Sequence, residues 1–563
     1  MESAQDASRN FKNLNNRRHI NANVINFNLA YLETKSERAA AKVTGIPRTT
    51  AQYHAKKQRE CDLDDAVLKF FRSDAGMVFL NQLVVAIEFV LSQLGHCGLR
   101  LIQQLYRLSQ LDCLVACSVG SLSQRIKQME TNLVTYSGQQ EATLAEAMTD
   151  NKAITCCLDE TFPSGICLVA MEPVSNFILL EEMAAKRDTA TWATAMEKRL
   201  ANLPVTVIQV ASDEAKALIK YTEQNLGAHH SPDLFHVQQE VSKASAAPLR
   251  AQIKKAQSVV GRAEADIQNQ RKQRALYENQ ELKPVGRPID HVAREAHAKV
   301  EHQYAIEELR ETESRRDKVR EANKALSEVY HPFDIETGEI RTPTRLRREL
   351  DNNFDVIETT VEEANLSENS TKRVEKARRM IDLMVDTLQF FWVIVNSQVK
   401  SLKLDKALEK IVRDTLLPAV YLELHAAKVQ IAAVRKQRLE SSAMLYAQLA
   451  KEKDWQSLPE EVKKELIKIA TECAQIFQRS SSNVEGRNGQ LSLHHHVYKN
   501  MNTRKLNAAT VIHNYFIRRQ DGTTAAERFF GKAPESLFNY LLSVTDYPAV
   551  PAKKRSIVRN MVA

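Results

Sequence analysis

The stretch "AITCCLDETF" (residues 153–162) opens the part of the chain that predicts a β-sheet. It is an apolar, β-branched run that ends in acids. Two similar runs follow closely, "GICLVAMEP" (165–173) and "NFILLEEM" (176–183), and Pro173 and the polar pair Ser175–Asn176 separate them. Three closely spaced strands of this kind predict an antiparallel meander.

The segments that follow alternate between helix and strand. A helix with Asp188 or Thr189 near its N-cap comes first. Residues 204–226, "PVTVIQVASDEAKALIKYTEQNL", predict a strand that ends at Asp213 and then a helix. Residues 231–244, "SPDLFHVQQEVSKA", predict one more short strand and helix. The order β-β-β-α-β-α-β-α is that of the RNase H-like fold, which combines a hairpin meander with right-handed parallel crossovers.

Two of the predicted strands end in acids. Asp159 closes the first strand, in "CLDE", and Asp213 closes the fourth, in "VASDE". These strands are neighbours in an RNase H-like sheet, so we expect both carboxylates at one edge. Adjacent carboxylates repel each other where solvation is poor, and a divalent cation such as Mg²⁺ or Mn²⁺ removes that repulsion. Two such ions can activate a water molecule and stabilise the leaving oxygen in phosphodiester cleavage.

A third carboxylate normally completes such a site, and it must come from a helix packed on the same sheet. Glu485 lies in "NVEGRNGQLS" (483–492), where a helix from about residue 482 can return to the sheet. An isolated glutamate is more often a solvated residue on a helix surface. The order of the surrounding motifs favours the site.

Several short segments resemble, in this order, parts of the DDE transposases of bacterial insertion sequences. "CLDET", "VASDEAKAL" and "PDLFHVQQEV" resemble the first acid strand, the second acid strand and the Asp-x-x-His segment. "NVEGRNGQLS" resembles the Glu-Gly-x-Asn stretch that carries the last acid, and "DGTTAAERFFGKAPESLF" (521–538) resembles the C-terminal tail. The resemblance covers residues 150–240 and 475–540. It implies that Asp159, Asp213 and Glu485 are the catalytic, metal-binding triad for two Mg²⁺ or Mn²⁺ ions.

Acids and a histidine beside the triad leave alternatives open. Glu160 adjoins Asp159, and strand alternation puts only one of the two on the metal face. Asp233 is either a rival third acid or a support for the site. In the second reading, His236 contacts a scissile phosphate or holds a ligand carboxylate. A helix cap and a packed histidine explain Asp233 and His236 equally well.

Basic and polar residues next to Glu485 are candidates for DNA contact. If Glu485 faces the metal, we expect Arg487 and Asn488 to face DNA phosphate. The run "HHH" at 494–496 has no Cys or acid cluster beside it, so DNA contact or plain helix surface explains it better than a zinc site.

The N-terminal part predicts a helix-turn-helix within residues 26–60. A helix through "SERAAAKVT" is stopped by Gly45, and a second helix, "RTTAQYHAKKQ", follows. Arg48, Lys56 and Lys57 of the second helix are expected to meet phosphates or base edges. An ordinary helical hairpin is the alternative.

A second, weaker helix-turn-helix candidate lies within residues 61–150, which read as helical throughout. Gly120 and Ser121 are expected to start its final helix, which carries Arg125 and Lys127. A plain helical packing domain explains this region about as well.

The long stretch from 241 to 475 reads as charged and helical. Two long antiparallel helices are expected over 249–280 and 294–330, with a break at 281–290 and a connector at 331–350. Strand signals do not return convincingly, so we interpret this block as a helical insertion in the catalytic domain. We expect it to form a separate body that grips DNA or a second protomer.

The chain of 563 residues is long enough for three or more domains. We expect an α/β plus all-α protein: an RNase H-like mixed sheet with a large helical insertion, preceded by helical helix-turn-helix domains. The expected segments are a helix-turn-helix domain (1–60), a helical domain (61–150), the first part of the catalytic core (151–240), the insertion (241–475), the last part of the core (476–545) and a basic tail (546–563).

Composition sets weaker bounds on partners and location. Lys and Arg number 78 against 70 Asp and Glu, and the net charge of +8 permits a polyanionic partner without requiring one. The eight Cys are scattered without metal-site spacing, and the N-terminus has no apolar signal core. We therefore expect a cytoplasmic, nucleoid-associated protein that does not enter membranes and acts on double-stranded DNA as a homodimer or larger assembly.

Four functions remain to be compared. The first is a DNA transposase that binds element ends and catalyses two-metal phosphodiester hydrolysis and strand transfer. The second is an RNase H-like nuclease or resolvase without strand transfer. The third is an inactive, transposon-derived DNA-binding protein, which the intact acids disfavour. The fourth is a helical scaffold, which leaves the acids at the strand ends without explanation.

Overall fold

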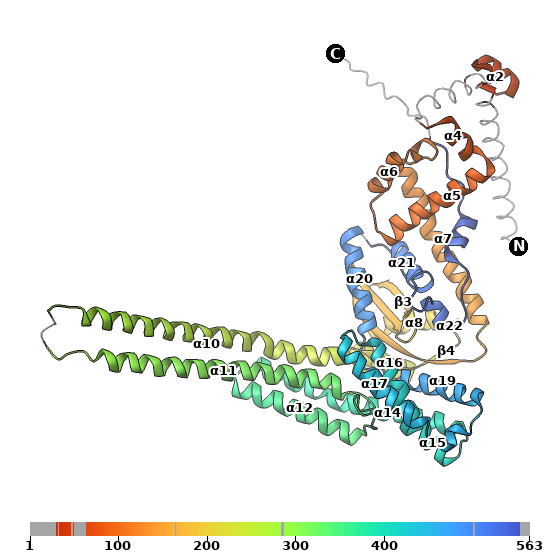
Figure 1. Cartoon of the computed structure of the whole chain (residues 1–563). Helices are drawn as coiled ribbons and strands as arrows, with labels where there is room; N and C mark the ends of the chain where they lie inside the picture. Colours follow the sequence, from red (N-terminus) through yellow and green to blue (C-terminus); the bar gives the residue numbers. More distant parts are fainter. Residues whose placement is uncertain are drawn as a thin grey trace.

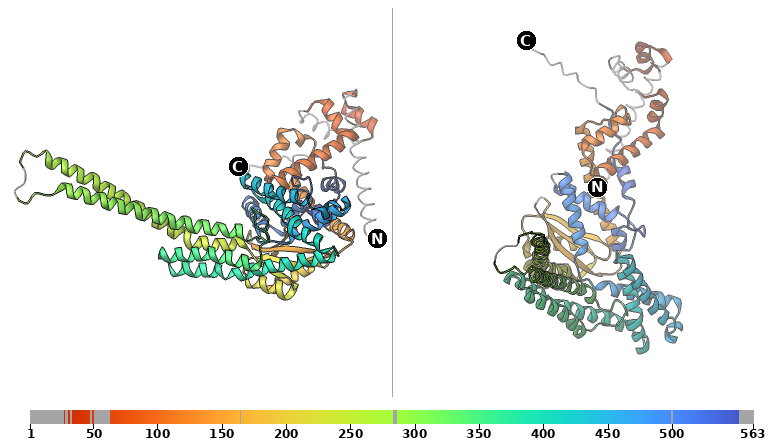
Figure 2. Two further views of the ribbon diagram at one scale, coloured as in Figure 1. Left: turned by 60° about the horizontal axis from the view of Figure 1, so that its bottom comes forward. Right: turned by 60° about the vertical axis from the view of Figure 1, so that its left-hand side comes forward.

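The computed structural model has a central α/β body with helices stacked at one end and a long helical arm (Figure 1). Two further views show the arm leaving the body on one side (Figure 2). The structure describes residues 27, 30, 31, 33–46, 49, 63–163, 165–282, 286–498 and 501–551. The expected combination of an α/β part with a helical part is confirmed.

A five-stranded mixed sheet lies at the centre of the body. Its strands are β1 (Lys152–Thr161), β2 (Ile166–Glu172), β3 (Phe177–Ala184), β4 (Val205–Ser212) and β5 (His229–Pro232). The order is β3-β2-β1-β4-β5, with β2 antiparallel to both β1 and β3, and β4 parallel to both β1 and β5. The apolar runs therefore form the predicted meander, and the later strands return beside β1 through helices.

Each face of the sheet packs on a different set of helices. One face, with Cys156 and Leu158 of β1, shares a core with helices from three parts of the chain. These are α7 (Val119–Glu146), α8 (Thr189–Leu200), α21 (Thr503–Tyr515), α22 (Ala525–Phe530) and α23 (Leu537–Val544). The other face, with Cys157, packs against Val484 and Leu491 of α20 (Ser482–Tyr498). The two ends of the expected catalytic core, separated by the helical block, thus fold onto one sheet.

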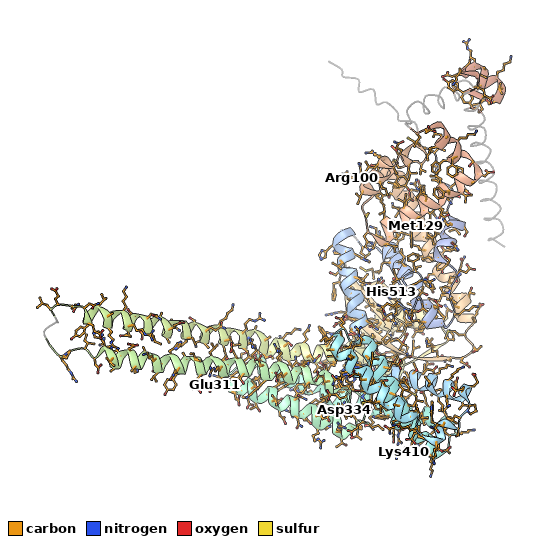
Figure 3. All side chains as sticks on the ribbon, in the orientation of Figure 1. Arg100, Met129, Glu311, Asp334, Lys410 and His513 are labelled. Carbon is orange, nitrogen blue, oxygen red and sulfur yellow. The ribbon has the colours of Figure 1, made fainter. Side chains whose placement is uncertain are left out.

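His513 of α21, labelled in Figure 3, ties this helix to the meander. Its Nε2–H donates a hydrogen bond to the carbonyl of Asn176, in the turn between β2 and β3, over 2.8 Å. Burial lowers the pKa of His513 to about 4, so the ring is neutral and carries one N–H for this contact.

The arm is an antiparallel pair of helices, α10 (Leu234–Glu278) and α11 (His291–Val329). The predicted break is confirmed, because neither helix enters residues 281–290. The first helix begins earlier than expected, directly after β5, and it accommodates Pro248. Charged side chains such as Glu311 line the outside of the arm (Figure 3).

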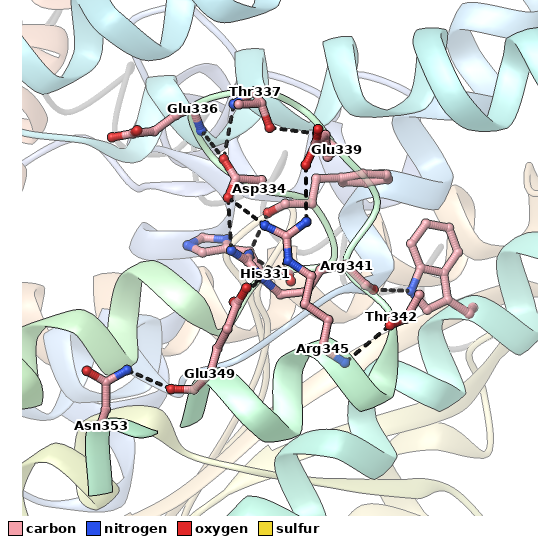
Figure 4. A network of polar contacts seen from close by, with 12 residues as sticks. His331, Asp334, Glu336, Thr337, Glu339, Arg341, Thr342, Arg345, Glu349 and Asn353 are labelled. Carbon is pink, nitrogen blue, oxygen red and sulfur yellow. Dashed lines mark hydrogen bonds and ion pairs between the residues drawn. The ribbon is translucent and has the colours of Figure 1, made fainter. Parts of the chain in front are cut away.

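The base of the arm is fixed by a network of ion pairs in the connector (Figure 4). Buried Arg341 contacts Glu349 through Nε over 2.7 Å and Asp334 through Nη2 over 3.2 Å. Arg345 binds the other oxygen of Glu349. The expected connector, 331–350, is shorter in the structure, because α12 (Pro343–Glu363) begins inside it with proline in its first turn, where the missing N–H costs nothing.

The remaining helices of the block pack around a hydrophobic core separate from that of the sheet. They are α13 (Glu368–Arg378), α14 (Met380–Ser401), α15 (Lys406–Ile411), η4 (Val412–Leu416), α16 (Leu417–Lys428), α17 (Ala432–Leu449), α18 (Lys453–Gln456) and α19 (Glu460–Ile476). Among the described residues of 241–475, the only β pairing is an isolated bridge between Phe333 and Ile340. Helix α14 covers the edge strand β5, where His229 contacts Thr387 over 3.1 Å.

The N-terminal helices only partly follow the predicted pattern. Helix α2 (Glu37–Thr44) starts at the Ser36 cap and stops at Gly45, whose φ of 69° suits glycine. Most of the expected second helix, with Arg48, Lys56 and Lys57, lies outside the described residues. Next come α4 (Asp65–Arg72), α5 (Asp74–Glu88), η1 (Phe89–Leu94), α6 (Leu99–Leu108) and η2 (Leu111–Cys113), and then α7. Residues of these helices form a hydrophobic cluster of their own, with Leu80, Ile102 and Leu122, and the later part of α7 continues into the core of the sheet.

Two helical stretches among the described residues, 74–94 and 368–401, are long and apolar enough by composition to span a membrane. Both bury side chains inside the protein: Val85 and Phe89 in the sheet core, and Leu388 and Phe391 in the core of the helical block. Core helices of soluble proteins have this composition too, so neither helix marks the chain as a membrane protein.

Candidate functional site

The register of the sheet brings two acids to one edge. Cys157 of β1 pairs with Ala211 of the parallel strand β4. Asp159 and Asp213 each stand two residues beyond this pair, so they lie side by side. Asp159 does not close its strand as expected, because β1 continues to Thr161 beside β2, whereas Asp213 directly follows the end of β4. Their proximity is also visible in their electrostatics, because the charge of Asp213 raises the pKa of Asp159.

The Asp159 carboxylate is partly buried under helix α20. Oδ2 accepts a hydrogen bond from Nδ2 of Asn488 over 2.7 Å, and Oδ1 accepts one from the backbone N–H of Glu160 over 2.8 Å. Burial is the main cause that raises the pKa of Asp159 to about 6, and the charge of Asp213 adds to it. Asp159 is therefore harder to ionise than an ordinary aspartate unless a cation compensates.

The neighbouring Glu160 points to the opposite face of the sheet. Its carboxylate accepts a hydrogen bond from the indole N–H of Trp192 over 3.2 Å and pairs with Arg187 over 3.3 Å. Side chains alternate along a strand, so Asp159 and Glu160 cannot share one face. The sequence left this choice open, and the structure puts Asp159 on the side of α20.

Helix α20 carries Glu485 to the same edge. It begins at Ser482, as expected, and Val484 and Leu491 are fully buried against the strands. Burial raises the pKa of Glu485, and the charges of Asp233 and Asp159 raise it further. Glu485 thus lies near Asp159, although the two residues are 326 positions apart in the chain.

Asp233 and His236 complete the group at the start of α10. Asp233 is the N-cap of this helix: Oδ1 accepts the N–H of Phe235 over 2.8 Å, and Oδ2 accepts the hydroxyl of Ser481. Nε2 of His236 lies 3.9 Å from Oδ2 of Asp233. The possible ligand atoms of Asp233, His236 and Glu485 all lie within 4.8 Å of one another.

Asp233 therefore has a structural role, and it also lies beside the third acid. The expected helix cap is present, and the bond to Ser481 additionally fixes the segment that leads into α20. Sequence reasoning missed Ser481, because nothing in its local pattern signals a partner 248 residues away. Among the described residues, this is the one group of three or more potential metal ligands this close together.

No cationic side chain of the described residues forms an ion pair with Asp159, Asp213 or Glu485. The hydrogen bonds to Asp159 and Asp213 come from neutral donors, the Asn488 amide and backbone N–H groups. Partly buried carboxylates that repel one another and lack a counter-ion fit a hard divalent cation. The donor set agrees with the expected Mg²⁺ or Mn²⁺ without distinguishing between them.

Arg487 does not lie where we expected it. Its guanidinium is buried and forms a two-bonded ion pair with Glu181 of β3, with both N–O distances at 2.7 Å. The hydroxyl of Thr510 from α21 also donates to Glu181. The expected phosphate contact is not available to a side chain that is only 4% exposed. Arg487 instead fastens α20 to the sheet.

Asn488 also differs from the expectation. Its amide binds Asp159 rather than facing outward, so it positions an acid of the site. The acid that holds Arg487 was not singled out from the sequence. The signal was present in "NFILLEEM", where an acid at an inward position of an apolar strand requires a buried cationic partner.

Arg125 of the second helix-turn-helix candidate is likewise engaged inside the protein. Nε donates to Glu88 over 2.9 Å, and Nη1 donates to the carbonyl of Ala116 over 2.7 Å. This ties α7 to α5 and leaves the guanidinium little freedom for DNA. Lys127 is exposed on α7, so its expected contact with DNA stays a prediction.

The histidine run at 494–496 lies near the end of α20. The ring of His494 packs against that of His96, with 3.9 Å between the ring centroids. Burial and then the charge of His96 lower the pKa of His494 to about 4. The described part of the chain places no cysteine or acid with this run as a group of metal ligands.

Comparison with known proteins gives one match, which covers the end of the helical block and the returning helices. Residues 412–557 match a family of unknown function, DUF6399. No curated protein and no solved structure matches the chain. The matched region includes Glu485, Arg487 and Asn488 but none of the strands. Asp159, Asp213, Asp233 and His236 lie outside it.

Proposed function

We propose that this chain is a DDE-type DNA transposase with an RNase H-like core that cleaves and joins DNA strands with two divalent metal ions. The observation that carries the proposal is the position of Asp159, whose pKa is raised by Asp213 of the neighbouring parallel strand and whose charge raises the pKa of Glu485 on the returning helix. None of the three acids has an ion-pair partner among the described residues. Glu485 in turn lies in the close group with Asp233 and His236. The strand order and crossovers agree with the core expected from the sequence. The resemblance in motif order points to transposition rather than to another two-metal reaction.

Asp159, Asp213 and Glu485 would hold the metal ions, with Asp233 and His236 beside them. Divalent ions in such a site activate a water or a hydroxyl group and stabilise the leaving oxygen. The protein's own contribution is placement. Asn488 orients Asp159, the Ser481–Asp233 bond fixes the start of α20, and this rigid support keeps Glu485 over the strand ends.

A groove at the base of the arm offers a surface for DNA. It lies between α10 and α11, has a volume of about 860 Å³, and includes Phe235, the neighbour of His236. Arg320 and Lys324 of α11 also line it. A basic groove suits a DNA backbone, and the arm is then the element that grips transposon DNA. In this proposal the protein works on double-stranded DNA near the bacterial nucleoid, as a dimer that pairs two element ends.

The first experiment measures cleavage and joining of labelled DNA that carries the ends of the element encoding this chain. Wild-type protein should cut it in Mg²⁺ or Mn²⁺ and lose activity with a chelator. Asp159→Asn and Asp213→Asn should bind the DNA with unchanged affinity but not cut it, because the metal site fails as a unit. Glu160→Gln is the matched control, since Glu160 lies on the opposite face of the sheet.

Equal loss of cleavage in Glu160→Gln and Asp159→Asn would contradict the assignment of the acids. Metal-dependent cutting without any joined product would favour the second candidate, an RNase H-like nuclease or resolvase. Both candidates use the same acids, so only the joined product separates them. Binding of the end DNA with no cutting in either metal would favour an inactive DNA-binding protein.

A further inference from the structure

A second cavity lies at the N-terminal end of α20, next to the acids but lined by different residues. It has a volume of about 740 Å³. Its walls come from the end of α16, from residues 477–483 ahead of and within α20, and from Pro173 and Val174 in the turn between β2 and β3. The helical block and the sheet body therefore meet in this pocket.

The pocket has an excess of positive charge. Lys428, Arg479 and Arg519 line it, and no Asp or Glu is among the described residues of its wall. None of the three cations forms an ion pair with a described carboxylate. Nη1 of Arg479 donates to the carbonyl of Tyr330 over 3.3 Å, and Nη1 of Arg519 donates to that of Val174 over 3.4 Å. These neutral partners orient the guanidinium groups. The nearest acids stand outside the lining: the charge of Glu172 acts on Lys428 and Arg519, and that of Asp521 acts on Arg519.

Lys428 lies close enough to the other two cations for the charges of Arg479 and Arg519 to lower its pKa. Part of the Lys428 side chain reaches solvent, yet the protein around it and then the charge of Arg479 lower its pKa. Burial lowers the pKa of Arg479 as well. His425 stays neutral, because burial and then Arg479 lower its pKa to about 3. Three cations that line one cavity and have no ion-pair partner among the described residues would favour an anion there.

The rest of the wall indicates what kind of anion fits. Tyr421, Leu424 and Phe477 give the pocket an apolar side. The volume is in the range of pockets that hold a drug-sized ligand and exceeds the need of a bare ion. Ser482 and Asn483, in the first turn of α20, add the N-terminal end of a 17-residue helix, which favours negative charge.

We propose that this pocket binds a nucleotide, with the phosphate held by Lys428, Arg479 and Arg519 and the base against the apolar side. The nucleotide is either free in solution or the phosphorylated end of a DNA strand, and the two share the chemistry that the pocket recognises. This inference goes beyond the proposed function and does not rest on it, because none of the pocket residues belongs to the acid cluster. Both sites use α20, one at its first turn and the other at Glu485.

The test is calorimetric titration of the full chain with ATP, with a short 5′-phosphorylated single-stranded oligonucleotide, and with inorganic phosphate. ATP or the oligonucleotide should bind more tightly than inorganic phosphate. Lys428→Ala and Arg519→Ala should each weaken that binding at least tenfold. Arg518→Ala is the matched control, because it removes the same charge from the adjacent residue, which does not line the pocket. Thermal unfolding confirms that each variant is folded.

Equal affinity of the wild type and of both pocket variants for ATP and for the oligonucleotide would overturn the proposal. Inorganic phosphate binding as tightly as the nucleotides would overturn it too, because the apolar side would then contribute nothing. Tighter binding of ATP identifies a free nucleotide as the ligand, and tighter binding of the oligonucleotide identifies a strand end. Asp213→Asn should bind these ligands like the wild type, so the pocket and the acid cluster fail independently.

Discussion

Helix α20 presents two carboxylate environments that are close in space and opposite in kind. On its inner side, Glu181 is completely buried and carries its own cation, Arg487, in a two-bonded pair. On the side of the strand ends, Asp159, Asp213 and Glu485 are less buried and have no ion-pair partner among the described residues. The difference separates an acid whose ion pair fastens α20 to the sheet from acids whose charges no side chain of the described residues balances in an ion pair.

The largest expected effect comes from neutralising one acid on each side of α20 and comparing the two variants. Glu485→Gln should remove DNA cleavage completely but keep DNA binding and thermal stability, because it deletes a charge that has no partner. Glu181→Gln should mainly lower the unfolding temperature, because it leaves Arg487 buried without a counter-ion. Cleavage of end DNA and circular dichroism melting measure the two effects. Cleavage by Glu485→Gln at the wild-type rate would return Glu485 to an ordinary surface acid.

Removing Arg487 instead of Glu181 should lower the free energy of unfolding by about as much, because it breaks the same ion pair. Arg487→Met leaves Glu181 buried and unpaired, for which about 3–5 kcal/mol is typical. The midpoint of urea unfolding measures the loss. Arg347→Met is the matched control, because Arg347 pairs with Asp382 on the surface over 2.7 Å and should cost no more than about 1 kcal/mol. If both variants unfold at the same urea concentration, the inner pair does not fasten α20.

The acid side should instead make stability depend on pH. Asp159 has a pKa of about 6 in the folded protein, above its ordinary value of 3.8, so the folded chain binds more protons than the unfolded chain between these values. Stability should therefore fall as pH rises from about 4 to 6, by up to about 3 kcal/mol for this group. Glu485 shifts in the same direction.

Melting temperatures across this pH range, with a chelator and with Mg²⁺, measure the effect. Mg²⁺ should remove most of the fall, because a bound cation favours the ionised acids. Asp159→Asn should flatten the curve measured with the chelator, whereas Asp382→Asn, at an exposed position, should leave it unchanged. Identical curves with and without the metal would mean that no cation binds at these acids.

The acids at the edge of the sheet could be predicted from the sequence, because their positions follow from local patterns. Apolar runs mark the strands, so Asp159 and Asp213 could be placed side by side before any coordinates, although β1 continues two residues past Asp159. The break in the arm was equally visible in the Pro- and Gly-containing stretch at 281–290. These features depend on residues that are close in sequence, and the pattern of each segment was enough.

The contacts of Arg487 and Asn488 could not be predicted, because they join residues that are hundreds of positions apart in the chain. Arg487 was expected to face DNA, because an exposed and a buried arginine look alike in a helical segment. Its partner, Glu181, is 306 residues away. The same reason explains why Asn488 was assigned to phosphate rather than to Asp159, and why α7 was placed in a separate domain although it packs on the sheet.

The smallest effect concerns Gly486, which stands between the two sides of α20. A Cβ added there would meet open space, and glycine inside a helix costs about 0.5–1 kcal/mol relative to alanine. No contact within the described protein requires glycine at this exposed position. Under the proposed function, a closely approaching DNA backbone would require it. Gly486→Ala should raise the melting temperature slightly and weaken cleavage of end DNA. Gly138→Ala in α7, where a Cβ would also meet open space, should give only the gain in stability. If Gly486→Ala is more stable and cuts as fast as the wild type, DNA does not approach α20 closely at this residue. The substrate would then lie farther from this part of α20 than we propose.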